Sequence, residues 1–311
     1  MPRVRPTIGQ RAGAGVALRN RTRSGPPASV RGKTGKTVGL ADGEFPILDL
    51  IKAAKPPYRG FREGKYTHVS DIISKCGRKI ALIRRMGTSH ASTRLMDGHA
   101  ITFAIGDAVH DFIKKRFTES HPEKVWAKWR CACGGTTTEA KLFADISTKD
   151  ECPTCNQIPY RYVEVVFEDD EHEVVGSPDL LLYFEDSAAF YVTEVKSMAA
   201  KMWDELERPV PDHIIQGLFY WMLMRSKGYS MIDQFSILYV KKEYTWKLPY
   251  KEFIIKPLEQ MHRLKEFLAE LTVIADARHP GNPLPKRVVC SSNTSSDAKE
   301  CPVCVTCFQL P

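Results

Sequence analysis

The chain has 311 residues, of which 43% are hydrophobic and 10% aromatic, which is enough to bury one large core or two smaller ones. No apolar run approaches the roughly 20 residues of a membrane-spanning helix, and the first residues lack the apolar segment of a secretory signal, so we expect a cytoplasmic protein. The net charge of +8 is concentrated near the start, where residues 1–40 hold nine Lys and Arg and no acidic residue.

Residues 1–42 are rich in Gly, Ser, Pro and Arg and poor in large apolar side chains, so we expect a disordered basic arm. Such an arm can attract the phosphates of nucleic acids, and it can equally serve only to keep the protein in solution. An organelle transit peptide is a third interpretation, although no clear amphipathic helix is present. The remaining residues, 43–311, are expected to fold.

Helices are expected first in the folded part. Residues 45–55 are interpreted as a short helix, and residues 68–87 as a longer one with Ser70 as its cap and Gly87 as its stop. Residues 103–117 place apolar side chains along one side at helical spacing, which predicts an amphipathic helix.

Residues 126–160 differ in character because they are rich in Cys, Gly and Thr, and they are interpreted as an insertion. Strands and helices are expected after it: strands at 160–170, 172–184, 190–198 and 235–243, and helices at 212–228 and 257–279. Asp212 is the expected cap of the first of these helices and Gly228 its stop. The order of elements indicates an α/β fold with a mixed central sheet flanked by helices.

Residues 172–198 are predicted to form a hairpin whose turn is centred between Asp186 and Ser187, so that residue 184 faces 189 and Asp179 faces Glu194. Directly paired residues have Cβ atoms about 5 Å apart, and two carboxylates at that distance repel unless a cation lies between them. Oxygen ligands favour Mg²⁺ or Mn²⁺.

Lys196 follows Glu194 by two residues and therefore points to the same face of its strand. An amine beside a metal-bound water can orient that water or stabilise negative charge. The alternative is that the strand lies at the edge of the sheet and its charges simply meet solvent.

Three motifs, taken in order along the chain, resemble the PD-(D/E)xK nuclease superfamily. GSPD followed by EVK is its core motif, while an upstream G-x-x-x-H and a later Q-x-x-x-Y are typical of its RecB-like branch. The matching residues are Gly106, His110, Asp179, Glu194, Lys196, Gln216 and Tyr220. Gln216 and Tyr220 share one helix face because they are four residues apart. The resemblance covers about residues 66–307, apart from the insertion.

The resemblance implies a restriction-endonuclease-like fold and a metal-dependent DNA exonuclease that acts on single strands or duplex ends. It implies that a metal-activated water hydrolyses the phosphodiester bond, with Mg²⁺ or Mn²⁺ held by His110, Asp179 and Glu194 and a possible further ligand in the Val195 carbonyl. Lys196 would position or activate the water. Gln216 and Tyr220 would orient the substrate. Such a nuclease suits recombination or repair in a bacterium or a phage-infected cell.

Two other functions remain open. One is a non-catalytic DNA-binding module on a nuclease fold, and the other is an endonuclease of the restriction type. The chain contains no G-x-x-x-x-G-K-[ST] motif of helicases, so any unwinding would come from a partner such as a helicase or a single-strand annealing protein.

Eight of the nine cysteines fall into two groups at short spacings, which favours metal binding over disulfides. The first group combines C-x-C and C-P-T-C and predicts a zinc site within the insertion, with free thiols as the alternative. Such a site could be purely structural or could grip DNA, and the sequence leaves both roles open. Its residues are Cys131, Cys133, Cys152 and Cys155.

The second group lies in the cysteine-rich segment 290–311, and Cys76 stands alone far upstream. The arrangement resembles AddB-type and CRISPR-associated nucleases, in which one early and three late cysteines hold a 4Fe–4S cluster. By that resemblance the ligands are Cys76, Cys290, Cys301 and Cys307, with Cys304 as the spare. The rival interpretation is a zinc site formed by Cys290, Cys301, Cys304 and Cys307, with Cys76 a buried thiol.

Overall fold

The computed structural model describes residues 58–59, 66–73, 76–86, 93–94, 97–146, 151–152, 154–243, 248–299 and 301–310. The chain divides into two units, Met1–Ala54 and Lys55–Pro311, and every described residue belongs to the second. The expected basic arm, the helix at 45–55 and the stop at Gly87 lie outside the described residues. No helix in the described part of the chain combines the length and apolar character that crossing a membrane requires.

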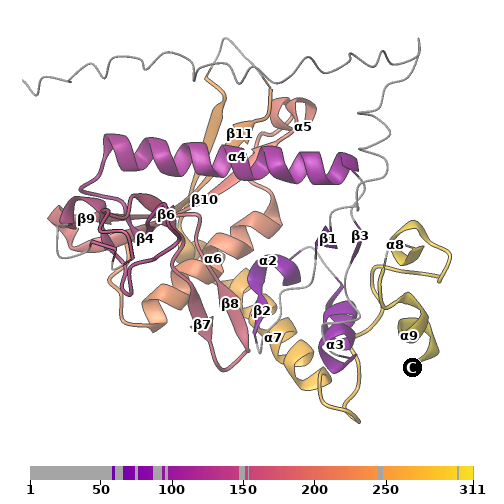
Figure 1. Cartoon of the computed structure of the whole chain (residues 1–311). Coiled ribbons are helices and arrows are strands. Elements are labelled where there is room, and N and C mark those ends of the chain that lie inside the picture. Colours follow the sequence, from indigo (N-terminus) through magenta and orange to yellow (C-terminus); the bar gives the residue numbers. More distant parts are fainter. Residues whose placement is uncertain are drawn as a thin grey trace, which may run out of the picture. The chain divides into compact units, whose positions relative to one another are not determined.

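A four-stranded mixed sheet forms the centre of the molecule, in the order β12-β11-β10-β9 (Figure 1). Its strands are β9 (Leu180–Phe184), β10 (Ala189–Met198), β11 (Phe235–Lys241) and β12 (Tyr250–Ile255). β10 and β11 run parallel, and the two outer pairs are antiparallel. The expected mixed α/β arrangement is confirmed, although β12 was not predicted.

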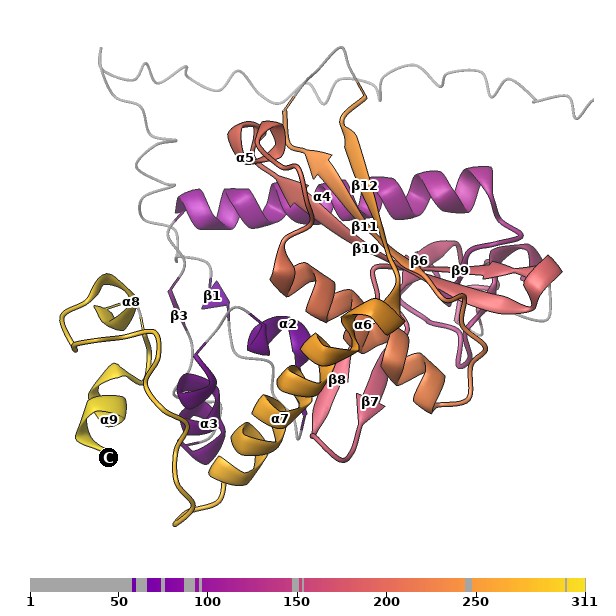
Figure 2. The ribbon, with the colours of Figure 1, turned by 180° about the vertical axis from the view of Figure 1, so that it is seen from behind.

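Helices cover both faces of this sheet. The long helix α4 (Asp97–Ser120) lies on one face, while α6 (Pro211–Ser226), backed by α7 (Met261–Ala277), lies on the other (Figures 1 and 2). Alternate residues of β10 explain the two contacts: Val192 belongs to the core cluster of α6, and Val195 to a cluster with Ile113 of α4.

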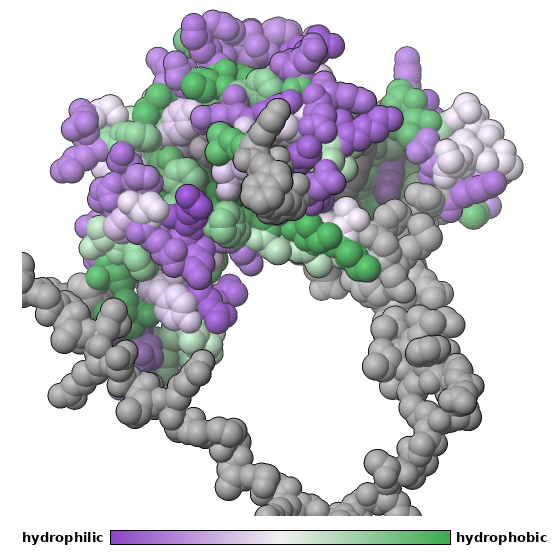
Figure 3. All heavy atoms as spheres, turned by 90° about the horizontal axis from the view of Figure 1, so that it is seen from above, coloured by the Kyte–Doolittle hydropathy of each residue, from purple (hydrophilic) through white to green (hydrophobic). Residues whose placement is uncertain are grey.

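α4 leaves a row of apolar side chains exposed, among them Ile101, Phe103, Ile105 and Phe112. Figure 3 views the molecule from the side on which α4 lies in Figure 1, and it shows hydrophobic atoms interspersed with hydrophilic ones there. The buried side of the helix carries Ile113.

The predicted helix 68–87 is two helices, α2 (Val69–Ile72) and α3 (Gly77–Met86). Ile73 is extended and ends α2, and His68, not Ser70, is its N-cap. Val69 and Ile72 of α2 pack in the main core, whereas Leu82 and Ile83 of α3 pack against the C-terminal segment. Ile80 of α3 also packs in the main core, so α3 contacts both clusters.

A second sheet has the order β2-β8-β7, formed by β2 (Thr67–His68), β7 (Phe167–Asp169) and β8 (Val174–Gly176). The strand expected at 172–184 is therefore interrupted between β8 and β9 by Ser177, Pro178 and Asp179. Pro178 has no N–H to donate to a strand ladder, which explains the break.

The insertion and the strand that follows it form a small sheet of order β5-β4-β6, which we call the insertion sheet. Its strands are β4 (Trp126–Arg130), β5 (Lys141–Leu142) and β6 (Arg161–Val163), and the 3₁₀ turn η2 (Phe143–Asp145) follows β5. Trp129 is buried between the rings of Phe143 and Tyr162. The insertion shares a hydrophobic cluster with Leu180 and Leu182 of β9, so it is packed against the central sheet.

The remaining elements are short: β1 (Tyr58–Arg59) pairs with β3 (Thr93–Arg94), and α5 (Ala200–Asp204), α8 (Ser296–Lys299), α9 (Cys304–Gln309), η4 (Glu185–Ser187) and η5 (Pro257–Gln260) complete the described part. α9 packs on α3 through Val303 and Cys307. Arg78 of α3 donates to the carbonyls of Pro285 at 3.1 Å and Leu310 at 2.7 Å, and these bonds fasten the C-terminal segment to α3.

Candidate active site

The hairpin has the predicted register. Ala189 pairs with Phe184, and the antiparallel ladder runs to Thr193 opposite Leu180. The next step of the same register places Asp179 opposite Glu194. Both side chains are buried, Asp179 being 8% and Glu194 1% exposed. The alternative in which these charges meet solvent at a sheet edge does not hold, because both side chains are buried and β10, which carries Glu194, lies between β9 and β11.

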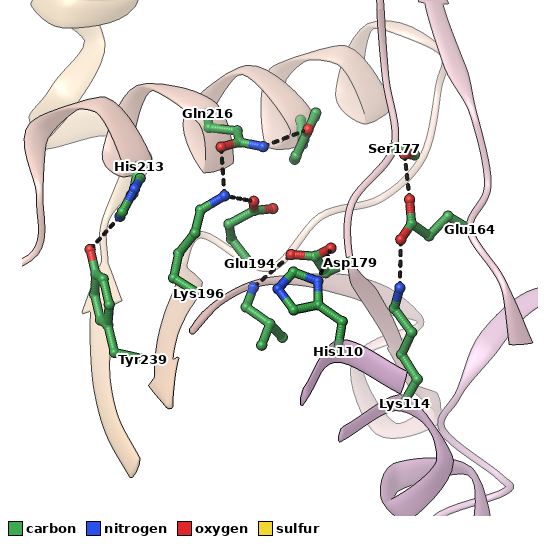
Figure 4. A network of polar contacts seen from close by, with 12 residues as sticks. His110, Lys114, Glu164, Ser177, Asp179, Glu194, Lys196, His213, Gln216 and Tyr239 are labelled. Atoms are coloured by element: carbon green, nitrogen blue, oxygen red, sulfur yellow. Dashed lines mark hydrogen bonds and ion pairs between the residues drawn. The ribbon is translucent and has the colours of Figure 1, made fainter. Parts of the chain in front are cut away.

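Asp179 joins α4 to the central sheet. Its Oδ1 lies 3.1 Å from Nδ1 of His110, and its Oδ2 accepts a hydrogen bond of 2.9 Å from the backbone N–H of Val195 (Figure 4). The hydrogen bond and charge of Asp179 outweigh burial and raise the pKa of His110, and a metal ion at Nε2 would have to displace the proton there. Val195 thus reaches the site through its N–H; a ligand role for its carbonyl stays a prediction.

Asp179 is held in its charged form. Burial by itself would raise the pKa of Asp179, but the hydrogen bond and charge of His110, with the charges of Lys196 and Lys114, lower that pKa to about 2. A carboxylate that stays ionised at neutral pH is the form that binds cations.

A chain of hydrogen bonds runs from Glu194 to α6. Nζ of Lys196 lies 2.6 Å from Oε1 of Glu194 and 2.9 Å from Oε1 of Gln216. Nε2 of Gln216 donates to the Tyr220 hydroxyl at 2.9 Å. Glu194, Lys196, Gln216 and Tyr220 are therefore connected by direct contacts (Figure 4).

The second carboxylate oxygen of Glu194 has no hydrogen-bond partner although it is fully buried. Burial and the charge of Asp179 raise the pKa of Glu194 to about 8. Leaving a buried carboxylate oxygen unpaired is costly, and a cation beside it would remove that cost. Glu194 is turned toward Lys196, and the ligand atoms of His110, Asp179 and Glu194 do not all lie within 4.8 Å of one another, so the unpaired oxygen is the observation here that favours a cation.

A second ion pair adjoins this cluster and was not predicted. Lys114 lies one helical turn after His110, and its Nζ is 2.5 Å from Oε1 of Glu164. Oε2 of Glu164 accepts a bond of 2.6 Å from Ser177 (Figure 4). The spacing of four residues between His110 and Lys114 could have indicated from the sequence that Lys114 lies near the site. Nothing in the sequence indicated Glu164, because it is distant along the chain from its partners.

His213 lies on the same helix as Gln216 but contacts another group. Its Nδ1 is 2.8 Å from the hydroxyl of Tyr239, which also accepts the backbone N–H of Val210 at 2.9 Å. Burial and the nearby charge of Lys196 lower the pKa of His213 to about 4. His213 thus braces the start of α6, where Val210 rather than Asp212 is the N-cap, against β11. The predicted end of the helix is confirmed, since Gly228 follows it with φ of 90°.

The four cysteines of the insertion lie together. Sγ of Cys131 is 3.0 Å from Cys155, and Sγ of Cys133 is 3.5 Å from Cys131 and 3.3 Å from Cys152. Within the described residues this is the one set of at least three possible ligands whose atoms all lie within 4.8 Å of one another. A Cβ on Gly135 would lie 2.8 Å from the sulfur of Cys152, so this glycine leaves the sulfurs room. The cluster could hold a metal ion.

The other cysteines gather where α3 meets the C-terminal segment. Burial and the nearby thiols of Cys76 and Cys307 raise the pKa of Cys290, and burial and the thiols of Cys290 and Cys307 raise that of Cys301. Cys301 and Cys307 share a hydrophobic cluster with Leu82 and Ile83 of α3, a helix that begins one residue after Cys76. Cys304 instead points to the carbonyl of Asn293, at 3.8 Å.

Comparisons with known proteins leave the chain without an assigned family. No protein-family model matches it, and no curated protein matches its sequence. The crystal structure of SSO0001 has a TM-score of 0.34 to this chain at 12% identity, covering 68% of this chain and 77% of the other. A crystal structure described as "Putative exonuclease" from Eubacterium rectale has a TM-score of 0.27 at 13% identity, covering 60% of this chain and 76% of the other.

Proposed function

We propose that the chain is a metal-dependent deoxyribonuclease with a restriction-endonuclease-like fold, of the RecB-like branch of the PD-(D/E)xK superfamily. It would be an exonuclease acting on single strands or duplex ends in recombination or repair, in the cytoplasm of a bacterium or a phage-infected cell. The observation that carries the proposal is the buried pair of carboxylates, Asp179 and Glu194, flanked by His110 and Lys196, with one oxygen of Glu194 left unpartnered.

His110, Asp179 and Glu194 would hold Mg²⁺ or Mn²⁺, with the Val195 carbonyl as a further ligand. When bound, the ion would lower the pKa of a water molecule and offset the charge of the phosphate under attack. Lys196 would donate a hydrogen bond that orients the attacking water or a phosphate oxygen. Gln216 positions the Lys196 ammonium, and Tyr220 positions Gln216, because each accepts a hydrogen bond from the one before it.

For the insertion, we propose structural Zn²⁺ bound by Cys131, Cys133, Cys152 and Cys155. Four thiolates at mutual contact are the ligand set of a closed zinc site. A site of this kind would add stability to the cysteine-bearing loops, which lie beyond the hydrophobic cluster of Trp129.

For the second group, the proposed cofactor is a 4Fe–4S cluster held by Cys76, Cys290, Cys301 and Cys307. Cys76 precedes α3 and the other three lie in the C-terminal segment, so the cluster would tie together two parts of the chain that Arg78 already joins. The zinc interpretation with Cys304 is disfavoured, because the Cys304 sulfur faces Asn293.

The test is digestion of end-labelled single-stranded and duplex DNA with Mg²⁺ or Mn²⁺. Asp179→Asn and Lys196→Gln should each lower the rate by about 100-fold or more. Asp186→Asn, a carboxylate in the exposed turn of the same hairpin, is the matched control and should keep the wild-type rate.

Three outcomes would contradict the proposal or change it. Intact, metal-loaded protein that binds DNA and never cuts it would be a DNA-binding module. Cleavage confined to internal sites would indicate a restriction-type endonuclease. Equal loss of activity in the Asp186 control would show that the hairpin charges are not a specific site. A helicase or annealing protein as a partner would be tested by its stimulation of duplex digestion.

A further inference from the structure

A cavity of about 600 Å³ lies between α4 and the insertion sheet. Lys114 and Lys115 of α4 line it on one side, and Arg130, Tyr160 and Arg161, on or beside the insertion sheet, line it on the other. We call this cavity the insertion groove. It adjoins the candidate active site, because Lys114 bonds to Glu164 and its charge helps to lower the pKa of Asp179.

The insertion side of the groove carries two like charges in direct apposition. Arg130 of β4 and Arg161 of β6 are paired residues of the antiparallel ladder, and both are exposed. Like charges directly opposite each other destabilise a sheet. Arg130 bonds to the hydroxyl of Thr136 at 3.3 Å, and no carboxylate among the described residues forms an ion pair with either guanidinium. An anion in the groove would turn this repulsion into attraction.

The charges on the α4 side are balanced. Lys114 is paired with Glu164, and Lys115 lies 3.8 Å from Glu119, so the excess positive charge of the groove belongs to the two arginines. Asp111 also borders the groove and keeps that excess small. The positive charge is therefore concentrated on the wall that the insertion provides.

An aromatic ring stands beside the arginine pair. Tyr160 is 53% exposed, and the guanidinium of Arg161 lies over its ring at 5.8 Å. The backbone N–H of Tyr160 bonds to the carbonyl of Arg130 at 3.2 Å, so ring and charges are fixed on one framework. Arginines next to an exposed aromatic ring are the combination that binds the phosphates and unpaired bases of single-stranded nucleic acid.

We propose that the insertion groove receives a single strand of DNA and leads it to the site of His110 and Asp179, with phosphates on Arg130 and Arg161 and one base against Tyr160. This deepens the proposed nuclease function and depends on it. It assigns the insertion a role in binding substrate, and the cysteine cluster would maintain the geometry of the two arginines. A single strand is favoured over a duplex because a base can stack on Tyr160 only when it is unpaired.

The test measures binding of the full chain to a fluorescent single-stranded oligonucleotide by anisotropy, without Mg²⁺ or Mn²⁺, over a range of salt concentrations. Replacing both arginines by glutamine (R130Q with R161Q) should weaken binding about tenfold or more and reduce the slope of log K against log salt by about 1.4, since each lost phosphate contact removes about 0.7. Tyr160→Ala should weaken binding about 5-fold or more and leave the salt slope unchanged.

Two controls separate charge from fold. R225Q with K227Q removes the same charge from the end of α6 and should leave affinity and slope near wild type. R130K with R161K keeps the charge and should retain the salt slope. Thermal unfolding of the double glutamine variant should be equal to or above wild type, because a repulsive pair has been removed.

Each result bears on one proposal or on both. If the wild-type protein cuts DNA but the double glutamine variant keeps the wild-type slope of log K against log salt, the groove proposal is wrong and the nuclease proposal still holds. A lysine variant as weak as the glutamine variant would show that lost packing, not lost charge, is responsible, and would also overturn it. If the variants lose the same affinity for duplex DNA as for single-stranded DNA, the proposal that the groove binds a single strand is wrong. Wild-type protein that neither binds nor cuts DNA would refute both proposals.

Discussion

Gly176, the last residue of β8, lies where a neighbouring ring leaves no space for a side chain. A Cβ at this position would be 2.4 Å from Cε1 and 3.0 Å from Cδ1 of Tyr220. Carbon atoms in normal contact are about 3.5 Å or more apart, so the ring would have to move by about 1 Å. Tyr220 is 3% exposed and belongs to the main core, which prevents an easy shift. We expect Gly176→Ala to lower the free energy of unfolding by about 1–3 kcal/mol, the usual cost of overpacking.

The same substitution should lower activity, because the displaced Tyr220 hydroxyl accepts the hydrogen bond that positions Gln216, and Gln216 accepts one from Lys196. Urea unfolding followed by circular dichroism gives the stability, and DNA digestion at a temperature where the variant is folded gives the activity. A cost of 1–3 kcal/mol corresponds to a Tm lower by about 2–10 °C for a domain of this size.

A double-mutant cycle identifies the ring as the cause. In a Tyr220→Leu background the clash is relieved, so Gly176→Ala should then cost less than about 0.5 kcal/mol. In a Tyr220→Phe background the ring remains and the cost should persist. An equal cost in the leucine and wild-type backgrounds would refute the reasoning.

Three further predictions concern the cysteines and pH. Cys152→Ser should abolish the zinc of the insertion, measured by elemental analysis, and lower the thermal stability, whereas unchanged metal content would contradict the site. Cys307→Ala should remove iron and the brown absorbance near 400 nm from anaerobically purified protein, while Cys304→Ala should keep both; colourless wild-type protein would exclude the cluster. The pKa of His213 lies near 4 in the folded chain and near 6.5 when unfolded, so the unfolded chain binds the extra proton and stability is lost as pH falls from 6.5 to 4. Between pH 7 and pH 5 the free energy of unfolding of His213→Asn should fall by about 2 kcal/mol less than that of wild type, measured by urea unfolding, and equal decreases would contradict this assignment.

Local patterns in the sequence were sufficient for the hairpin. Its register follows from alternation with a period of two residues and from a short polar turn, both of which act between near neighbours. The connection between Gln216 and Tyr220 follows likewise from the helical spacing of four residues. The two cysteine groups could be recognised because metal ligands close together in the chain have a characteristic spacing.

Other boundaries depended on contacts that local patterns do not contain. The helix expected at 68–87 ends at Ile73, which is extended, and resumes at Gly77, and β12 pairs with the edge of β11. Intrinsic helix and strand propensities alone predict neither the break in the helix nor the pairing of β12.

The sequence by itself determined which residues of the hairpin and of α6 would face one another, because those relations are set by periods of two and 3.6 residues. Only the tertiary structure decided that Glu164 bonds to Lys114, that the sulfur of Cys304 faces Asn293, and that Arg130 and Arg161 line one cavity with α4. These are contacts between segments that are far apart in the chain. They are fixed by how whole elements pack, and no local period encodes them.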